Sequence, residues 1–210
     1  MSGFTLLHGS EAADTHAMLI TEWDDAGWPW WSGPEWDLNL FGARSPDRTL
    51  GEWDDVIGCA YSSRGQPFVF LARATTDPGR EGTDVRSDGI AVLPAGYHRG
   101  LFERGTHKMG TPGAHYALRQ RRPVMVGRDA IVDGESVGEG ESAAHGINLH
   151  APWAEGLTQV KDASHGCQVV WSRLALSCIL EAYDRQGGDS VSYALTESAG
   201  VHRALARHLA

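Results

Sequence analysis

The residues best suited to chemistry lie in the run Ser164-His165-Gly166-Cys167, and a further histidine, His150, stands seventeen positions before the cysteine. A cysteine is a strong nucleophile only as its thiolate, and a free thiol has a pKa of about 8.5, so a neighbouring base or positive charge must activate it. A glycine allows a tight turn whose amide groups face a developing oxyanion. Together these parts favour acyl transfer through a thioester.

This pattern resembles the catalytic signature of the YkuD-type L,D-transpeptidases. The resemblance implies that Cys167 attacks a peptidoglycan stem peptide and that His150 is the base. It also implies that His165 and Gly166 are catalytic residues that shape the turn and the oxyanion pocket. Family members usually continue after the cysteine with an apolar residue and then Arg or Asn, whereas here the chain continues with Gln168 and two valines. The usual arginine for the substrate carboxylate is therefore missing from that place.

A wider resemblance, to a phage and bacterial branch of YkuD-like proteins, spans roughly residues 38 to 196. It implies a mainly β (α+β) fold: a YkuD-like β-sandwich or mixed-sheet domain with a helix after the catalytic cysteine. The segments that carry it are Phe41-Gly42-Ala43-Arg44, Trp53-Asp54-Asp55, Thr75-Thr76-Asp77-Pro78-Gly79, Gly146-Ile147-Asn148-Leu149-His150 and Gly166-Cys167-Gln168-Val169.

Four further residues are candidates for substrate binding. Ser164 belongs to the motif itself. In an alternating strand Asn148 shares a face with His150, where it either orients the imidazole or bonds a neighbouring strand. By the resemblance, Tyr116 and Arg119 lie in a segment that lines the donor-peptide groove. Arg119 would then hold a substrate carboxylate through a bidentate pair, or else belong to a solvated basic patch.

Several polar residues near these segments have two interpretations. His165 is either a wall of the pocket or an exposed turn residue. Asp77 either binds a substrate amine or, as we favour, caps a turn in Asp-Pro-Gly. Asp54 and Asp55 are expected at the surface or in a hairpin, and His145 is expected to face away from His150 unless the strand is irregular at Gly146.

Zinc is the main chemical alternative, since His145, His150, His165 and Cys167 are all possible ligands. The chain has no CxxC pair and no HExxH helix, so the spacing matches no common zinc pattern. It also has no glycine-rich phosphate loop and no GxSxG elbow. We therefore predict no metal and no cofactor.

Composition limits the class of protein. A chain of 210 residues with 41% hydrophobic residues suits one large domain with a sizeable core. Its net charge of −9 argues against nucleic acid or an anionic membrane as a partner. No apolar run approaches the ~20 residues of a membrane span, and no signal peptide is visible. We expect synthesis in the cytoplasm and action at the bacterial cell wall or periplasm after release or delivery, in an oligomeric state that the sequence leaves open.

The cysteines do not form a disulfide framework, because there are three of them at irregular spacing. Cys59 follows an apolar run in an expected strand, and Cys178 lies in an apolar helical stretch. Both are expected to be small buried hydrophobic residues, although a disulfide between them stays open.

Residues 1–37 are interpreted as a Trp-rich N-terminal extension, and residues 38–210 as the catalytic domain. Five of the eight tryptophans fall in the extension, among glycines and prolines that disfavour a long helix. The rings either form a platform for glycans or, as we favour, pack into the edge of the core.

Periodicity and turn signals predict short strands with a few helices. A helix is expected at Trp171–Gln186 with its stop at Gly187, a terminal helix at Ser198–Leu209, and a polar mobile loop at Asp129–Glu141. The expected strands are Asp37–Gly42, Asp55–Ser62, Pro67–Thr75, Gly89–Leu93, Tyr97–Leu101, Pro123–Val126, His145–His150 and Val191–Leu195.

The sequence thus predicts an L,D-transpeptidase or L,D-carboxypeptidase that works through a Cys167 thioester. A first alternative is a lytic peptidoglycan amidohydrolase or endopeptidase of a phage or secreted effector. A second is a non-enzymatic module that binds the cell wall.

Overall fold

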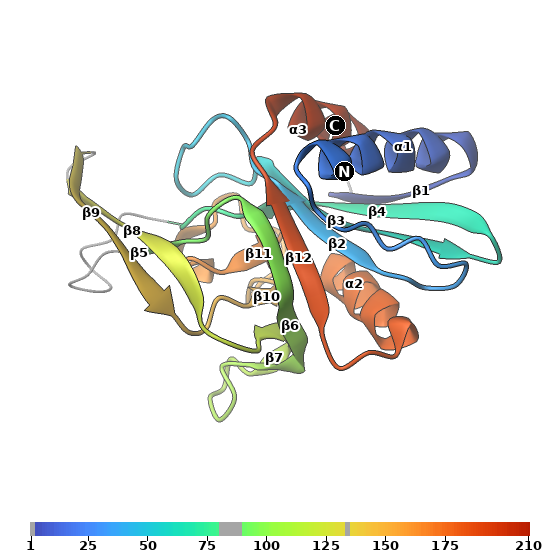
Figure 1. Ribbon diagram of the computed structural model, residues 1–210. Helices are drawn as coiled ribbons and strands as arrows, with labels where there is room; N and C mark the ends of the chain where they lie inside the picture. The colour runs from blue at the N-terminus through green and yellow to red at the C-terminus, as the bar shows by residue number, and fades with distance from the viewer. Residues whose placement is uncertain (1–2, 80–89, 133–134) are drawn as a thin grey trace.

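The computed structural model describes residues 3–79, 90–132 and 135–210 (Figure 1). Strands make up most of the fold. They are β1 Phe4–His8, β2 Asn39–Ala43, β3 Asp55–Ser63, β4 Gln66–Thr75, β5 Ile90–Val92, β6 Gly96–His107, β7 His115–Gln120, β8 Val124–Val132, β9 Glu135–Ala144, β10 Leu149–His150, β11 Gln168–Val170 and β12 Val191–Thr196. The helices are α1 Gly9–Asp25, α2 Arg173–Gln186 and α3 Ala199–Ala206, with short 3₁₀ turns at Lys161–Ala163 and Arg207–Leu209.

The main sheet closes on itself. Its strand order is β1-β4-β11-β10-β7-β6-β12-β2-β3, and β3 also pairs with β4. Within this sheet, every strand except β1 therefore belongs to a closed, barrel-like ring. One edge of β4 serves two partners. β1 pairs with its first part, from Phe68 to Ala72, and β11 pairs with Ala74 and Thr75. The mainly β, α+β expectation is confirmed. The main sheet is mixed, with the parallel pairs β10–β11 and β12–β2 among antiparallel ones, and it is closed, which was not expected.

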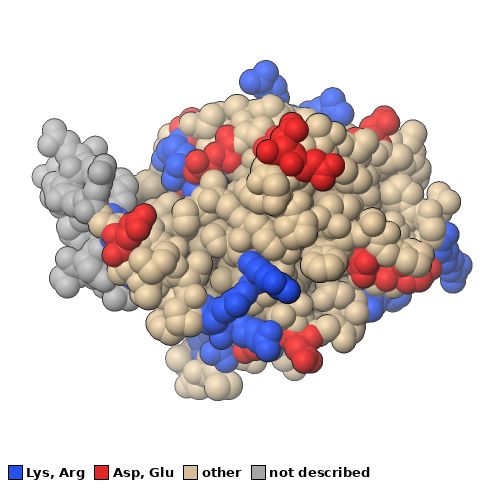
Figure 2. Space-filling view, in the orientation of Figure 1, with Lys and Arg blue, Asp and Glu red and all other residues tan. Residues whose placement is uncertain are grey.

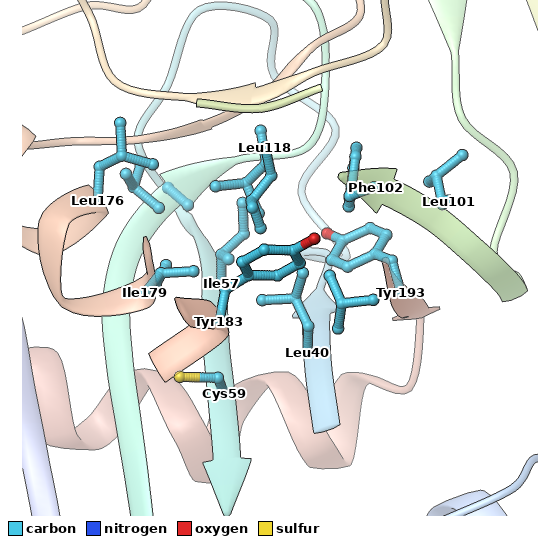
Figure 3. Close-up of a cluster of buried hydrophobic side chains, with 14 of the residues drawn as sticks. Leu40, Ile57, Cys59, Leu101, Phe102, Leu118, Leu176, Ile179, Tyr183 and Tyr193 are labelled. Carbon is cyan, nitrogen blue, oxygen red and sulfur yellow. The ribbon is translucent and has the colours of Figure 1, made fainter. Parts of the chain in front are cut away.

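Successive residues of a strand point to opposite faces of a sheet, and helices cover both faces here. One face packs against α2, and part of this cluster is drawn in Figure 3. The other face packs against α1 and α3 (Figure 1). The α2 side includes Leu40, Ile57, Cys59, Phe70 and Ala72, and the α1–α3 side includes Phe41, Val56, Ala60, Val69 and Leu71.

The helix predicted after the cysteine is confirmed as α2. The Ser172 side chain accepts a hydrogen bond from the Ala175 N–H at 3.0 Å, which satisfies a free amide of the first turn. Gly187 ends the helix in the left-handed conformation, with φ of 73°. The terminal helix is also present, and Ser198 caps it as expected.

The N-terminal segment is more regular than expected. β1 pairs with β4, and the long helix α1 follows it, so the expectation that this segment contains no long helix is wrong. Glycine and proline are dense only from Gly27 on, after α1 has ended. Trp23 is 1% exposed and packs edge-to-face against Trp28 and Phe41, as the core interpretation predicts.

The expected mobile loop at Asp129–Glu141 is wrong over its described residues. β8 and β9 form an antiparallel hairpin there, and β5 pairs with β8 to complete a second, three-stranded sheet. Main-chain hydrogen bonds between neighbouring strands outweigh the poor strand propensity of glycine and glutamate.

Other strand boundaries shift, and β7 and β11, like β1 and β9, were not predicted as strands. β6 runs on to His107, and β7 follows it as an unpredicted hairpin partner. The strand expected at His145–His150 shortens to its last two residues, because Gly146 has φ of 93°. Of the strand expected at Gly89–Leu93, Gly89 lies outside the described residues. The residues Ile90–Val92 form β5.

The surface shows no dominant sign of charge on the face seen in Figure 2, where small acidic and basic groups are separated by uncharged areas. None of the helices in the described ranges is long and apolar enough to cross a membrane.

Candidate active site

Strand register brings Cys167 and His150 to one face of the sheet. β10 and β11 pair in parallel, with Leu149 opposite Gln168 and His150 opposite Val169. Residues directly opposite each other project to the same side, and Cys167 lies two positions before Val169. Cys167 and His150 therefore lie on the same face of the sheet, on neighbouring strand positions.

The turn before Cys167 requires glycine. Gly166 has φ of 113°, and a Cβ atom there would lie 2.4 Å from the main-chain oxygen of Ala91 in β5. The Ser164 hydroxyl accepts a hydrogen bond from the Gly166 N–H at 3.2 Å and donates one to the Cys167 carbonyl at 2.8 Å. Ser164 thus fixes the turn from within, and the Gly166 amide that was expected to face an oxyanion is bonded to this hydroxyl.

In the segment that connects β10 to Cys167, main-chain hydrogen bonds hold the second half, from Val160 to Ser164. The Val160 N–H donates to the Gly51 carbonyl at 2.8 Å, and the Gly79 N–H donates to the Ser164 carbonyl at 2.9 Å. Gly79 packs so closely that a Cβ atom would lie 1.8 Å from the Lys161 oxygen. These contacts anchor the turn Ser164–Cys167 to the loops around β4.

The Cys167 residue is partly exposed, and its thiol is held by main-chain groups. Sγ donates to the Gly146 carbonyl at 3.2 Å. Burial of the sulfur raises the pKa of the Cys167 thiol, while a hydrogen bond from the Asn148 backbone and the charge of Lys108 act in the opposite direction. The net direction is upward, so the resting cysteine is a neutral thiol.

His150 is 3% exposed, and its tautomer is fixed. Nδ1 lies 2.8 Å from the Ala151 carbonyl, which can only accept, so Nδ1 carries the proton and Nε2 carries the lone pair. Within the described ranges Nε2 has no hydrogen-bond partner. Burial, and after it the neighbouring His107, lowers the pKa of His150 to about 3. The ring is a neutral base with a free acceptor atom.

Two more histidines complete the cluster. The His107 ring stacks on the His150 ring with centroids 3.9 Å apart, and the His115 ring lies 5.5 Å from that of His150. Asn148 donates through Nδ2 to Nδ1 of His107 at 3.0 Å and accepts from the Gln120 N–H at 2.9 Å. Asn148 therefore lies on the His150 side, as predicted, but it orients His107 and acts on His150 only through that ring.

No family model, curated protein or solved structure matches this chain. The site is therefore interpreted from its own geometry. The thiol proton points to Gly146 and the His150 acceptor is unbonded, so proton transfer requires the thiol to turn toward the ring. Catalytic hydrogen bonds commonly tighten only when substrate is bound.

The remaining predicted site residues lie around this centre. His165 points out of the turn with its Nε2 3.9 Å from Asp162 Oδ1, and its side chain is 44% exposed. Tyr116 is 69% exposed at the start of β7, and the guanidinium of Arg104 covers its ring at 4.9 Å. Arg119 is exposed further along β7, and its charge contributes to the lowered pKa of His107.

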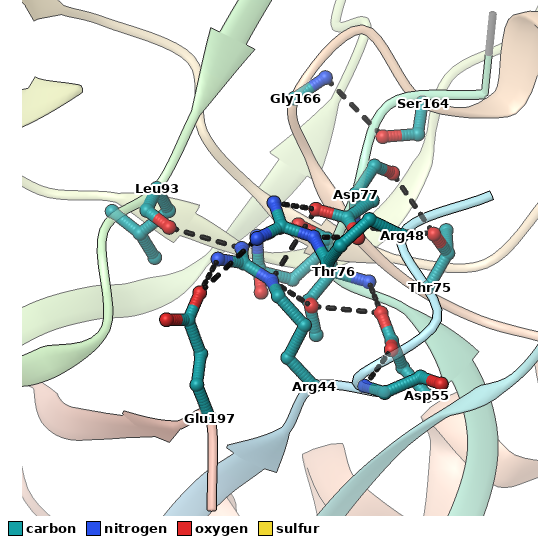
Figure 4. Close-up of polar contacts among 12 residues, drawn as sticks. Arg44, Arg48, Asp55, Thr75, Thr76, Asp77, Leu93, Ser164, Gly166 and Glu197 are labelled. Atoms are coloured by element: carbon teal, nitrogen blue, oxygen red, sulfur yellow. Dashed lines mark hydrogen bonds and ion pairs between the residues drawn. The ribbon is translucent and has the colours of Figure 1, made fainter. Parts of the chain in front are cut away.

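Asp77 lies in the bend after β4, as expected, but its carboxylate does not cap that turn. Asp55 lies at the start of the β3–β4 hairpin, one of its two expected places, and it is buried. Asp77 is 5% exposed, and its carboxylate accepts two hydrogen bonds from Arg48 and lies 3.3 Å from the buried Arg44 (Figure 4). Asp55 is 2% exposed and accepts from the main chain of Ser45 and from both donors of Thr76. Burial raises the pKa of Asp55 to about 6. This network supports the loops against which the nucleophile turn rests.

The metal alternative gains no support, since no group of three or more His, Cys, Asp or Glu side chains in the described segments is arranged to hold an ion. Cys59 is buried as predicted, Cys178 is partly exposed, and both are free thiols.

The residues predicted for the site from the sequence did not include His107, His115 and Lys108. All three lie where β6 turns into β7, and His107 is directly opposite His115 in that hairpin. Two histidines eight positions apart, with Gly110 and Gly113 between them, were a usable signal for a hairpin that brings the rings together.

Proposed function

We propose that this protein is a YkuD-like cysteine acyltransferase that acts on peptidoglycan stem peptides, as an L,D-transpeptidase or L,D-carboxypeptidase. One observation carries the proposal: Cys167 shares a sheet face with His150, whose Nε2 is a buried acceptor without a partner among the described residues. The helix α2 also supports the proposal, because the resemblance implies a helix after the cysteine.

The pKa directions favour a neutral thiol and a neutral imidazole at rest. In the proposed first step, His150 Nε2 takes the thiol proton as Sγ attacks the amide carbonyl between an L-centre and a D-residue. The C–N bond then breaks, His150 returns the proton to the leaving amine, and Cys167 carries the acyl group as a thioester. Lys108 is the nearby cation that stabilises negative charge on sulfur.

The thioester has two outcomes. Transfer to an amine gives a new crosslink, and transfer to water gives a shortened stem peptide or a cleaved bridge. The second outcome corresponds to the lytic alternative, and it uses the same nucleophile and base.

The test is digestion of purified sacculi and muropeptides, read by mass spectrometry, with wild-type protein and Cys167→Ala. Cys178→Ala is the matched control, because it removes another partly exposed thiol. We expect loss of a D-residue, bridge cleavage or new crosslinks with the wild type and the control, and none with Cys167→Ala. Unchanged muropeptides with all three proteins would contradict the proposal and favour a wall-binding module.

A further inference from the structure

A pocket beside Trp31 is separate from the site around Cys167. Its volume of ≈ 330 Å³ lies at the small end of the range of roughly 300–1,000 Å³ for ligand pockets, which suits a single sugar-sized unit. Four parts of the chain line it: the segment before β2, the first half of β6, the end of α2 and the start of β12. None of its residues belongs to the histidine cluster or to the turn Ser164–Cys167.

Trp31 is the aromatic residue of this pocket, and its main chain is held firmly. The Trp31 N–H donates to Asn39 Oδ1 at 2.9 Å, and the Trp31 carbonyl accepts from Asn39 Nδ2 at 2.8 Å. Asn39 is itself 5% exposed in β2, whereas Trp31 is 51% exposed. The other four tryptophans of residues 1–37 are buried or partly buried. A large residue that is held in place and left open can bind a ligand without first being ordered.

The pocket also offers polar groups whose hydrogen-bonding capacity is only partly used. Ser192 Oγ accepts from the Gly100 N–H at 3.0 Å, and Ser190 Oγ accepts from Arg121 at 3.1 Å. Neither hydroxyl donates to a residue in the described ranges, so both protons are available to a ligand. Asp37 accepts a main-chain N–H at 2.7 Å through Oδ2, and its Oδ1 has no partner among the described residues.

Arg99 supplies a positive charge to the same pocket. It is exposed, and no carboxylate in the described part of the chain forms an ion pair with it. Its neighbour Arg121 differs, because it bonds to Ser190 and lies 3.7 Å from Glu103. The guanidinium of Arg99 is therefore available to bind a carboxylate.

A purely apolar ligand does not suit these groups, because it would leave the serine hydroxyls and the Asp37 carboxylate without partners. A pyranose ring has a face of C–H groups, which stacks on an indole, and a rim of hydroxyls that both donate and accept. We propose that this pocket binds a sugar unit that carries a carboxylate. The ring stacks on Trp31, the hydroxyls bond to Asp37, Ser190 and Ser192, and the carboxylate pairs with Arg99. This site goes beyond the proposed acyl transfer and does not depend on it.

The experiment is a ligand-observed NMR titration of the full chain with N-acetylmuramic acid, glucuronic acid and N-acetylglucosamine. The first two sugars carry a carboxylate at different positions, and the third carries none. The variants are Trp31→Ala and Arg99→Met. Trp153→Ala is the matched control for the first, because Trp153 is 50% exposed and lies outside the pocket. Arg64→Met removes an exposed cation elsewhere and is the control for the second. Thermal unfolding checks that each variant folds.

We expect wild type to bind the two acids roughly three- to fivefold more tightly than N-acetylglucosamine, about the most that an exposed ion pair contributes. Trp31→Ala should weaken the binding of all three sugars about tenfold, as loss of a stacking partner predicts. Arg99→Met should remove the preference for the acids and keep the binding of N-acetylglucosamine. Both controls should bind as wild type does. Tighter binding of N-acetylmuramic acid would identify a wall glycan as the source, and tighter binding of glucuronic acid a uronic-acid polymer.

Two results would overturn the inference. If wild type binds none of the sugars, or if Trp31→Ala and Trp153→Ala lose equal affinity, the pocket is not a sugar site. If the three sugars bind wild type equally, the carboxylate is not held by Arg99. Cys167→Ala should bind the sugars as wild type does, so a failure of acyl transfer and a failure of sugar binding are observed separately.

Discussion

The imidazole rings of His107 and His150 lie face to face, with centroids 3.9 Å apart and planes inclined by 12°. His107 is held in turn by Asn148, so a chain of contacts leads from the main chain of β7 to the proposed base. The stack fixes the plane of a ring whose position decides whether Nε2 can reach the thiol.

Replacing His107 should therefore test whether its ring orients the His150 ring, separately from any effect of its charge. We expect His107→Phe, which keeps a flat ring, to acylate Cys167 within about threefold of wild type. His107→Ala should be slower by roughly tenfold, because a stacked pair contributes about 0.5–1.5 kcal/mol. The measurement is the rate of the nitrophenolate burst released as p-nitrophenyl acetate acylates Cys167, with thermal unfolding as a control for folding. Equal rates for both variants would show that the stack does not orient His150.

The pH dependence of thiol reactivity should show that Cys167 and His150 are neutral at rest. Burial raises the thiol pKa, and a His150 pKa of about 3 keeps the imidazole neutral above pH 5. Alkylation by iodoacetamide should thus rise about tenfold per pH unit from pH 6 to 8, since only the thiolate reacts. Mass spectrometry of the Cys167 peptide gives the rate, in a Cys178→Ala background. A rate that is flat below pH 7 would instead indicate a thiolate–imidazolium pair.

Lys108 supplies a charge that lowers the pKa of the Cys167 thiol. Lys108→Met should shift the alkylation profile to higher pH and slow alkylation at pH 7, because less thiolate is present there. Arg64→Met removes a cation from the distant β3–β4 turn and serves as the control, for which we expect no shift. The same profile for Lys108→Met and wild type would remove Lys108 from the site.

Gly166 should tolerate no side chain. Gly166→Ala combines a φ of 113° with a contact of 2.4 Å to the Ala91 oxygen, so we expect a loss of at least about 1–3 kcal/mol in unfolding free energy and loss of the burst. Gly156→Ala is the control, because its φ is also positive, at 73°, but no atom lies within 4 Å of its Cβ position. Chemical denaturation of both variants gives the comparison. Equal destabilisation would mean that the contact with β5 has no energetic role.

Arg44 and Arg48 should differ in their effect on stability although both bind Asp77. Arg44 is 1% exposed, and its loss leaves a buried carboxylate short of a partner, which typically costs about 3–5 kcal/mol. Arg48 is 48% exposed, and an exposed pair contributes about 0–1 kcal/mol. Urea denaturation of Arg44→Met and Arg48→Met measures the difference. A similar loss for both would show that Asp77 does not depend on the buried arginine.

The nucleophile turn, the helix α2 and the common face of Asn148 and His150 follow from local pattern. Each rests on short-range rules: glycine at a positive φ, a serine cap with a glycine stop, and alternation along a strand. These rules act within a few residues, so a single sequence is enough to apply them.

The histidine cluster and the buried arginine network depend on contacts across the chain. His107 meets His150 only because β7 lies between β6 and β10 in the closed sheet, and strand order is not visible in a short motif. Asp77 looked like an ordinary turn residue because its partners, Arg44 and Arg48, come from a loop some thirty positions earlier. The neighbours of His107 and Asp77 therefore depend on pairing between distant segments, which local propensity does not determine.

The parallel pairing of β10 with β11 also limits where insertions and deletions can occur between His150 and Cys167. The two strands fix His150 and Cys167, while the chain between them crosses exposed surface around Gly156 before the contacts at Val160 anchor it. The number of residues between base and nucleophile is therefore free to change near Gly156. An insertion between Ser164 and Gln168 would instead rotate the thiol to the opposite face. In a search for related chains, the spacing inside the turn is a stricter criterion than the number of residues between His150 and Cys167.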